Sequence, residues 1–149
     1  MLHSRDRILT THVGSLPRNE VLTDLLIRRE VGEGIDANTM AAEMDRAVRS
    51  TVEAQVAAGI DIGNDGEQQR VGFQTYIPAR MSGFGGESKR KVGKDFQEVP
   101  ELIEMFLRRF PRRAKISNAP QAVGEVRYLD TKDIKEEIAR FKRCIAAAP

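Results

Sequence analysis

The amino-acid sequence predicts an α/β fold in which short strands alternate with helices. Three apolar runs typical of strands, at 7–13, 60–64 and 122–128, are separated by segments with helical periodicity. This alternation is characteristic of parallel strands joined by helices. Three strands cannot close a barrel, which takes eight strands and about 250 residues. The pattern therefore fits either a small open α/β layer or the first portion of a larger barrel.

The first strand and the first helix are expected near the N-terminus. The run at 7–13 is rich in β-branched residues and ends at Gly14, and Pro17 prevents its continuation. A helix is expected over 19–29, with Gly32 just beyond its end. Its apolar residues at helical spacing are Val21, Leu22, Leu25 and Leu26.

The next helix and strand are the most clearly marked pair. Apolar residues between positions 40 and 56 fall on and beside one helical stripe. Asp36 or Asn38 is expected to cap the start of this helix, and Gly59 stands where a left-handed residue ends it. The strand at 60–64 follows almost immediately.

The segment 72–99 is predicted to be a long excursion from this alternation. Glycines and a lysine-rich run interrupt the periodicity there, and such loops in a packed domain are usually functional or mobile. Helical spacing resumes over 100–110, and the third strand is expected at 122–128. Asp130 or Thr131 is expected to cap a last helix. Its apolar face comprises Ile134, Ile138, Phe141 and Ile145.

The composition describes one globular domain. Of the 149 residues, 40% are hydrophobic and 31% are charged. No apolar run approaches the roughly 20 residues of a membrane span. The N-terminus lacks the apolar core of an export signal, so a cytoplasmic location is expected. The single cysteine, Cys144, precludes an intramolecular disulfide and fits a reducing compartment.

The charge balance argues against a nucleic-acid partner. The chain has 24 basic and 22 acidic residues, a net charge of +2, whereas nucleic-acid-binding domains usually carry a concentrated basic face. Local basic clusters occur at 89–91 with Lys94 and at 108–113. We interpret them as a solvated loop and a helix end, where cations are favoured.

Polar clusters follow the first two predicted strands. The sequence THVGSLPR at 11–18 and the sequence NDGEQQR at 64–70 each carry polar residues where an apolar run ends. The ends of parallel strands meet at one edge of a sheet, where α/β proteins place their binding sites. Ser15 and Glu67 are therefore expected to converge on one pocket.

Simpler structural interpretations exist for the same residues. Glu67 could pair with Arg70 or cap the following turn, and Ser15 could be a helix N-cap. Asn64 and Asp65 are more typical of residues that fix a turn through bonds from side chain to backbone.

The histidines and the cysteine also allow a structural interpretation. His12 could be a general base or a metal ligand, but a histidine beside a strand is more often a hydrogen-bonded structural residue. His3, His12 and Cys144 lack the ligand spacing of a zinc site. Cys144 is expected to be a buried, inert thiol beside the apolar stripe of the last helix.

Three stretches, in this order, resemble the cobalamin-independent methionine synthase family, and more narrowly its single-barrel relatives. They are THVGSLPR at 11–18, GIDIGNDGEQ at 59–68 and RMSGFGG at 80–86. Residues 120–128 and the helix after them are similar to the next strand and helix of that family. The resemblance implies that residues 1–149 form the N-terminal part, about the first three βα units, of an incomplete (β/α)8 TIM-barrel-like domain.

The resemblance also implies methyl transfer from a methyl-folate to the sulfur of homocysteine, with zinc activating the thiol as a thiolate. In the family, the Gly-Ser pair after the first strand holds the carboxylate of the amino acid, and the Glu after the second strand holds its ammonium. These positions are Gly14, Ser15 and Glu67. The residue types suit the roles, because backbone N–H groups at a turn attract anions and a fixed carboxylate pairs with an ammonium.

Four further residues are secondary candidates for the site. They are His12, Asn64, Asp65 and Arg80. Arg80 and the glycine-rich turn at 83–86 could bind the anionic tail of a folate.

Two departures from the family leave the substrate open. The long synthases have Thr and Ile ahead of the Gly-Ser pair, where this chain has His12 and Val13. After the Glu they have Pro-Glu-Arg, where this chain has Gln68, Gln69 and Arg70. The family's zinc ligands (a His-x-Cys pair, a Glu and a later Cys) belong to later strands, so no metal ligand is expected in this chain.

The isolated chain is therefore expected to lack methyltransferase activity. One alternative is a zinc-dependent thiol alkyltransferase of the same superfamily, such as one acting on coenzyme M. Another alternative is a non-catalytic module that self-associates or assembles with a partner chain, because an open barrel would expose strand edges and apolar surface.

Overall fold

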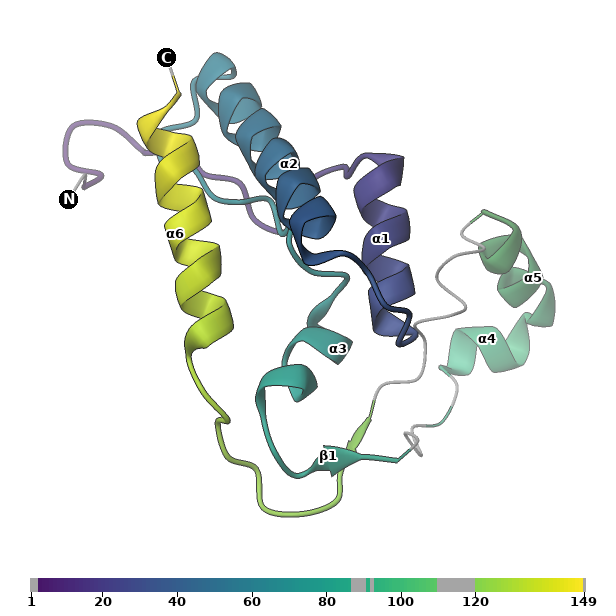
Figure 1. Ribbon diagram of the computed structural model, residues 1–149. Coiled ribbons are helices and arrows are strands. Elements are labelled where there is room, and N and C mark those ends of the chain that lie inside the picture. The colour runs from purple at the N-terminus through teal and green to yellow at the C-terminus, as the bar shows by residue number, and fades with distance from the viewer. Residues whose placement is uncertain (1–2, 87–90, 92, 110–119, 149) are drawn as a thin grey trace. The chain divides into compact units, whose positions relative to one another are not determined.

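The computed structural model describes residues 3–86, 91, 93–109 and 120–148 (Figure 1). Its elements are, in order, α1 (Glu20–Glu30), α2 (Ala37–Ala57), α3 (Phe73–Tyr76), the 3₁₀ helix η1 (Pro78–Arg80), β1 (Phe84–Gly85), α4 (Lys94–Glu98), α5 (Pro100–Arg109), β2 (Gln121–Ala122) and α6 (Lys132–Ala146). The chain divides into two compact units. The first unit comprises Met1–Leu26, Ile35–Val71 and Asp130–Pro149, and the second comprises Ile27–Gly34 and Gly72–Leu129.

The first unit has a core between α1 and α2, and both helices confirm the sequence prediction. α1 begins after Asn19, whose side-chain Oδ1 accepts the N–H of Leu22 over 2.8 Å. α2 begins after Asp36, whose carboxylate accepts the N–H of Thr39 over 2.7 Å. These caps satisfy helix N–H groups that have no partner within the helix. The buried apolar residues of this core are Leu22, Leu25, Leu26, Met40, Met44 and Ala47.

α6 packs against α2 through a second buried cluster (Figure 1). The cluster contains Val48, Val52 and Cys144. Cys144 is 4% exposed, and burial raises the pKa of its thiol. The predicted burial of this cysteine is confirmed.

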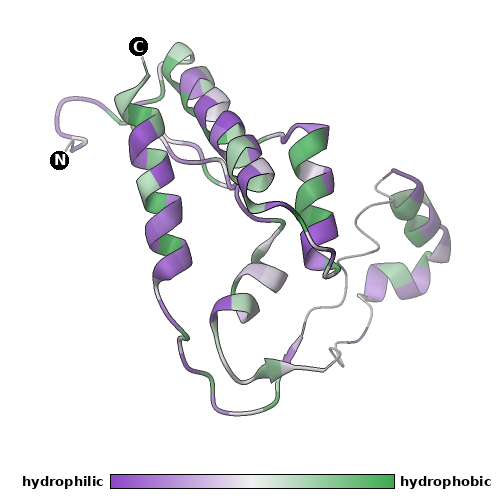
Figure 2. Ribbon diagram, viewed as in Figure 1, coloured by the Kyte–Doolittle hydropathy of each residue, from purple (hydrophilic) through white to green (hydrophobic). Residues whose placement is uncertain are grey.

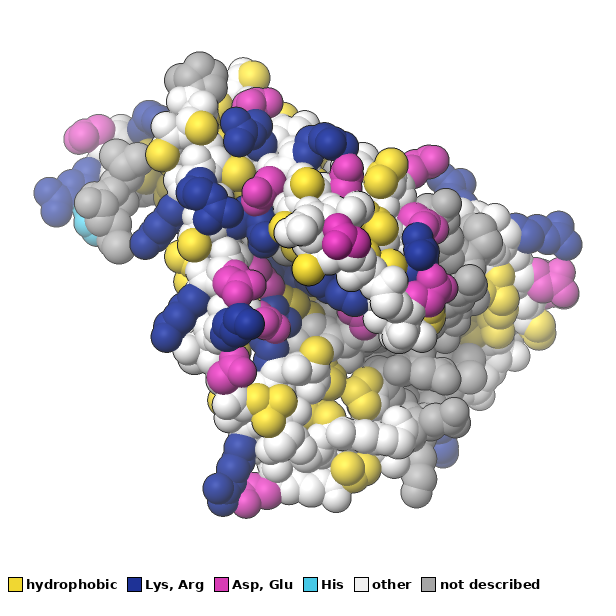
Figure 3. All heavy atoms as spheres, in the orientation of Figure 1, with side chains coloured by type: hydrophobic (Ala, Val, Ile, Leu, Met, Phe, Trp, Pro, Cys, Tyr) yellow, Lys and Arg dark blue, Asp and Glu magenta, His cyan; other side chains and the backbone are white. Residues whose placement is uncertain are grey.

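The start of α6 is fixed by one of the two predicted caps. Asp130 accepts the N–H of Lys132 over 2.8 Å, whereas Thr131 makes no capping bond with its side chain. Apolar and polar residues alternate along α6 at helical spacing (Figure 2). On the face drawn in Figure 3, basic and acidic side chains lie next to one another over α2 and α6.

The first two predicted strands are reduced to one parallel bridge. Thr11 and Ile62 form this bridge, in which the N–H of Ile62 donates to the carbonyl of Thr10 over 3.1 Å. The N–H of Thr10 donates to the carboxylate of Asp61 over 2.8 Å. This N–H therefore bonds a side chain and not a backbone carbonyl of the neighbouring segment. The predicted parallel neighbours are confirmed, but the predicted strand lengths at 7–13 and 60–64 are wrong.

The third predicted strand, in the second unit, is also corrected. β2 pairs with β1 in antiparallel orientation, with Phe84 opposite Ala122. Tyr128 forms an antiparallel bridge with Met81. The expected parallel strand over 122–128 is therefore wrong, because its partner comes from the predicted excursion over 72–99.

Glycine allows this antiparallel pairing to be close. Gly83 has a φ of +80°, and a Cβ built there would lie 2.4 Å from the carbonyl oxygen of Glu125. The N–H of Val123 donates to the carbonyl of Gly83 over 2.8 Å. A side chain at this position would therefore push the two segments apart.

α5 confirms the helix predicted over 100–110 as far as Arg109, and Phe110 lies outside the described residues. Phe96 of α4 meets Phe106 of α5 edge to face, with ring centroids 6.4 Å apart. Of the basic clusters, residues 89–90 and 112–113 lie outside the described part of the chain. Within that part, no helix combines the length and the apolar character needed to cross a membrane.

Candidate functional site

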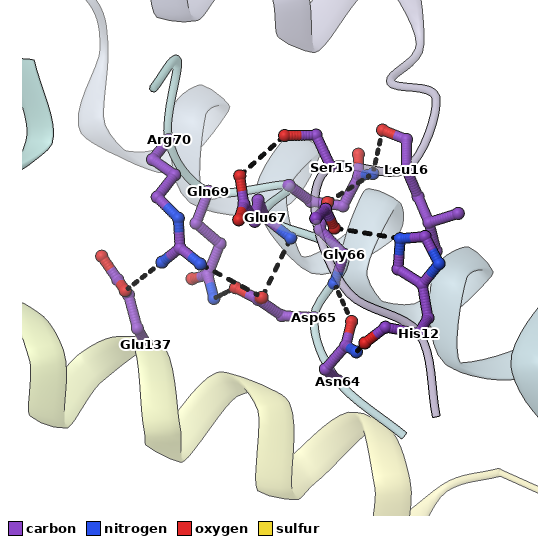
Figure 4. A network of polar contacts seen from close by, with 12 residues as sticks. His12, Ser15, Leu16, Asn64, Asp65, Gly66, Glu67, Gln69, Arg70 and Glu137 are labelled. Carbon is purple, nitrogen blue, oxygen red and sulfur yellow. Dashed lines mark hydrogen bonds and ion pairs between the residues drawn. The ribbon is translucent and has the colours of Figure 1, made fainter. Parts of the chain in front are cut away.

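Ser15 and Glu67 lie in direct contact in the first unit (Figure 4). The hydroxyl of Ser15 donates to Oε2 of Glu67 over 2.7 Å. The predicted convergence of these two side chains is confirmed. Ser15 is exposed and Glu67 is half-buried, so solvent reaches the pair.

The turn that carries Glu67 has an unusual backbone. Gly66 and Glu67 have φ values of +59° and +56°, and the N–H of Gln68 donates to the carbonyl of Asp65 over 3.2 Å. Two successive positive φ values are those of a type I′ turn. Among the described residues, Glu67 is the only one other than glycine with a positive φ. Such a conformation costs free energy and persists only where surrounding contacts enforce it.

Asn64 and Asp65 supply some of those contacts. Oδ1 of Asn64 accepts the N–H of Gly66 over 2.8 Å, and Oδ1 of Asp65 accepts the N–H of Glu67 over 3.0 Å. Asn64 also donates from Nδ2 to the carbonyl of His12 over 2.5 Å. The turn-fixing interpretation of Asn64 and Asp65 is confirmed.

Arg18 holds the other side of the turn, and sequence reasoning gave it no role. Its guanidinium donates to the carbonyls of Glu67 at 2.8 Å, Arg70 at 2.7 Å and Gln68 at 3.1 Å. Burial lowers the pKa of Arg18, with the Glu67 carboxylate acting in the opposite direction. Nothing in the sequence around Arg18, which follows Pro17, indicates that its guanidinium contacts this turn.

Gln68 and Gln69 are buried, with exposures of 1% and 3%. Nε2 of Gln68 donates to the carbonyl of Leu16 over 3.1 Å. Nε2 of Gln69 donates to Oδ2 of Asp65 over 3.1 Å. The sequence showed these two residues only as a departure from the family pattern, whereas the structure makes both of them part of the turn's support.

Arg70 forms ion pairs with Asp65 at 3.9 Å and Glu137 at 3.8 Å (Figure 4). The structural alternative for Ser15 is wrong. Ser15 does not cap α1, because Asn19 does.

The remaining candidates are placed as follows. Nε2 of His12 lies 3.0 Å from the carbonyl of Gly14, a contact in which His12 is the donor because a carbonyl only accepts. Gly14 has a φ of +95°, so the backbone itself favours glycine there. Arg80 belongs to the second unit, where its guanidinium stacks on the ring of Tyr76 at 3.6 Å and bonds the carbonyl of Tyr76.

The donor set in the described residues does not fit zinc. No three His, Cys, Asp or Glu side chains gather there in a way that could hold a metal ion. Cys144, the thiol of the chain, is buried between α2 and α6. Its raised pKa disfavours the thiolate that zinc binds.

Comparison with known proteins supports a distant relationship to methionine synthases. The chain is 29% identical to the methionine synthase of Sulfurisphaera tokodaii over 110 residues, which cover 66% of this chain and 32% of that protein. It therefore spans about a third of the length of this curated relative. No protein-family model matches the sequence, and no solved structure gives a significant match.

Proposed function

We propose that this chain forms the N-terminal part of a methionine-synthase-like (β/α)8 barrel and binds the amino-acid end of a thiol substrate, homocysteine, at Ser15 and Glu67. The observation that carries this proposal is the 2.7 Å hydrogen bond between the two side chains. It brings a hydroxyl donor next to the Gly14 turn together with a fixed carboxylate, and a zwitterion would need one group of each kind. The distant likeness to a methionine synthase supports the same assignment.

The chemistry of the pair suits an exchange of partners on binding. In the structure, the hydroxyl of Ser15 donates to Glu67. An incoming ammonium would donate to Glu67 with a full charge, which makes a stronger hydrogen bond than a hydroxyl does. The hydroxyl of Ser15 would then turn to the α-carboxylate, beside the backbone of Gly14. The rigid turn at 64–70 keeps Glu67 in place during this exchange.

Methyl transfer itself is proposed for the complete barrel. The zinc site and the methyl-folate site would be built by further strands. The parallel bridge between Thr11 and Ile62 is the pairing expected of two neighbouring barrel strands. Ile8 and Val13, which flank that bridge, are 86% and 87% exposed and offer apolar surface for further strands to cover.

The binding proposal is tested by calorimetric titration of the 149-residue chain with homocysteine. Glu67→Gln should weaken binding by about 2 kcal/mol, or about thirtyfold, because a hydrogen bond to a charged group is lost. Glu53→Gln makes the same change at an exposed position on α2 and should leave the affinity unchanged. Equal affinities in the two variants would refute a role for Glu67.

A second titration separates homocysteine from the coenzyme M alternative. Coenzyme M (2-mercaptoethanesulfonate) has a sulfonate and a thiol but no ammonium, so a carboxylate contributes nothing to binding it. If coenzyme M binds more tightly than homocysteine, and Glu67→Gln leaves its affinity unchanged, the amino-acid assignment is wrong.

The barrel proposal predicts that this chain associates when studied alone. Light scattering during size-exclusion chromatography should find species larger than 16.7 kDa, because exposed apolar residues beside an open strand edge promote association. A folded, stable monomer would argue against the need for further strands.

A further inference from the structure

Two side chains on one face of α6 contact the turn that carries Glu67. Glu137 and Arg140 are three positions apart, which places them on the same side of the helix. Nη1 of Arg140 donates to Oε1 of Gln69 over 2.5 Å, and the Glu137 carboxylate lies 3.8 Å from the guanidinium of Arg70 (Figure 4). α6 is therefore joined to the turn by polar contacts as well as to α2 by apolar ones.

The side-chain amide of Gln69 bonds both Arg140 and Asp65 and so connects them. Oε1 faces the guanidinium of Arg140, which only donates, and Nε2 faces the carboxylate of Asp65, which only accepts. Only this orientation of the amide satisfies both neighbours. The other oxygen of Asp65 accepts the N–H of Glu67 over 3.0 Å. An unbroken series of hydrogen bonds thus connects α6 to the backbone of Glu67.

Arg140 is itself held firmly. Its side chain is 13% exposed, and its Nε donates to Oδ1 of Asp45 on α2 over 2.6 Å. Arg143, on the same helix, also reaches Asp45, at 3.5 Å, but is 64% exposed and bonds Asp45 rather than Gln69. Of the two arginines, Arg140 is therefore the one that links the α2–α6 pair to the turn.

We infer that Arg140 is a positioning residue for Glu67. It fixes Gln69, which fixes Asp65, which holds the strained backbone of Glu67 in its left-handed conformation. The inference deepens the proposed function and rests on it, since the ligand contact is made by Glu67 and Ser15. Arg140 itself would touch no ligand.

The first test measures amide hydrogen exchange by NMR in the ligand-free chain. Arg140→Gln should accelerate exchange of the Glu67 amide about tenfold, the effect of weakening one hydrogen bond of ordinary strength. The Gly66 amide is the internal reference, because it donates to Asn64 and not to Asp65. Arg143→Gln is the matched control and should change neither amide. No acceleration at Glu67, or equal acceleration at Gly66 and Glu67, would overturn the inference.

A second variant tests the link through Gln69. Gln69→Glu keeps an oxygen acceptor for Arg140 but replaces the donor to Asp65 with a carboxylate. Exchange of the Glu67 amide should rise although the contact with Arg140 persists. Unchanged exchange at Glu67 in a folded Gln69→Glu variant would show that Gln69 transmits nothing.

Binding by the same variants separates this inference from the proposed function. The dissociation constant for homocysteine should rise about fivefold in Arg140→Gln, in the range found for residues that act through others, and should not change in Arg143→Gln. An unmodified chain that binds no homocysteine would refute the proposed function while leaving the exchange result intact. Homocysteine bound equally well by Arg140→Gln and by the unmodified chain would refute positioning alone.

Discussion

Gln68 and Leu16 are joined across 52 positions by a hydrogen bond from the Gln68 amide to the Leu16 carbonyl. The same amide lies 3.3 Å from the carbonyl of Pro17, and the side chain is 1% exposed. In return, the N–H of Leu16 donates to the carbonyl of Gly66 over 3.0 Å. The segment that carries Ser15 and the turn that carries Glu67 are thus joined by backbone groups and by the buried side-chain amide of Gln68.

Gln68→Leu should destabilise the chain by about 1 kcal/mol, because the half-buried carbonyl of Leu16 loses a hydrogen bond of ordinary strength. Gln74→Leu makes the same change at an exposed position and should alter the free energy of unfolding by less than about 0.5 kcal/mol. Urea denaturation of both variants measures the difference. Equal stabilities would mean that water replaces the amide at no cost.

Glu67→Gly and Glu67→Ala remove the same carboxylate but differ in backbone freedom. Glycine adopts a φ of +56° without strain, whereas alanine keeps the strain of the left-handed region. We expect Glu67→Gly to be more stable than Glu67→Ala by about 1 kcal/mol, as measured by urea denaturation. Both variants should lose homocysteine binding. If the alanine variant is the more stable, the turn does not hold Glu67 under strain.

Gly66→Ala tests the close packing under the same turn. A Cβ at Gly66 would lie 3.0 Å from both Leu16 and Thr51, and its φ is +59°. Strain and overpacking together should lower the free energy of unfolding by about 3 kcal/mol. Gly59→Ala has a similar φ of +71° but open space around its Cβ, so it should cost only about 1 kcal/mol. Thermal or urea unfolding of the pair isolates the packing contribution.

Asp61 should make stability depend on acid pH. The guanidinium of Arg7 and the N–H of Thr10 hold the pKa of Asp61 well below its usual range. Since the pKa is lower in the folded chain than in the unfolded chain, the stabilisation is complete above the unfolded pKa of about 4. It is lost as the pH falls from there toward the lower folded pKa. The free energy of unfolding should therefore fall less steeply below pH 4 in Asp61→Asn than in the unmodified chain.

A matched control for that measurement is Asp6→Asn, an exposed change that alters the net charge by the same amount. Unfolding is followed by circular dichroism at several pH values. An identical acid dependence in Asp61→Asn and the unmodified chain would show that the contact with Arg7 contributes no pH-dependent stability.

The helices could be predicted from the sequence because the residues that determine them are close together in the chain. The apolar spacing of α1 and α2, the caps at Asp36 and Asp130, and the stop at Gly59 all lie within a few residues of the bonds they determine. The strands were predicted with the wrong length or orientation for the opposite reason. A strand is defined by its partner, and apolar runs at 7–13 and 122–128 do not specify which distant segment bonds them or in which direction.

The sequence by itself determined the helical framework and the meeting of Ser15 with Glu67, because both depend on local pattern and on polar residues at the ends of neighbouring parallel segments. The turn-fixing role of Asn64 and Asp65 was also predicted, but the tertiary structure alone decided which distant residues support Glu67. Arg18, Gln68 and Arg140 act on the turn from 49 or more positions away or through buried amides, and hydrogen bonds between segments so far apart leave no periodic signal in the chain.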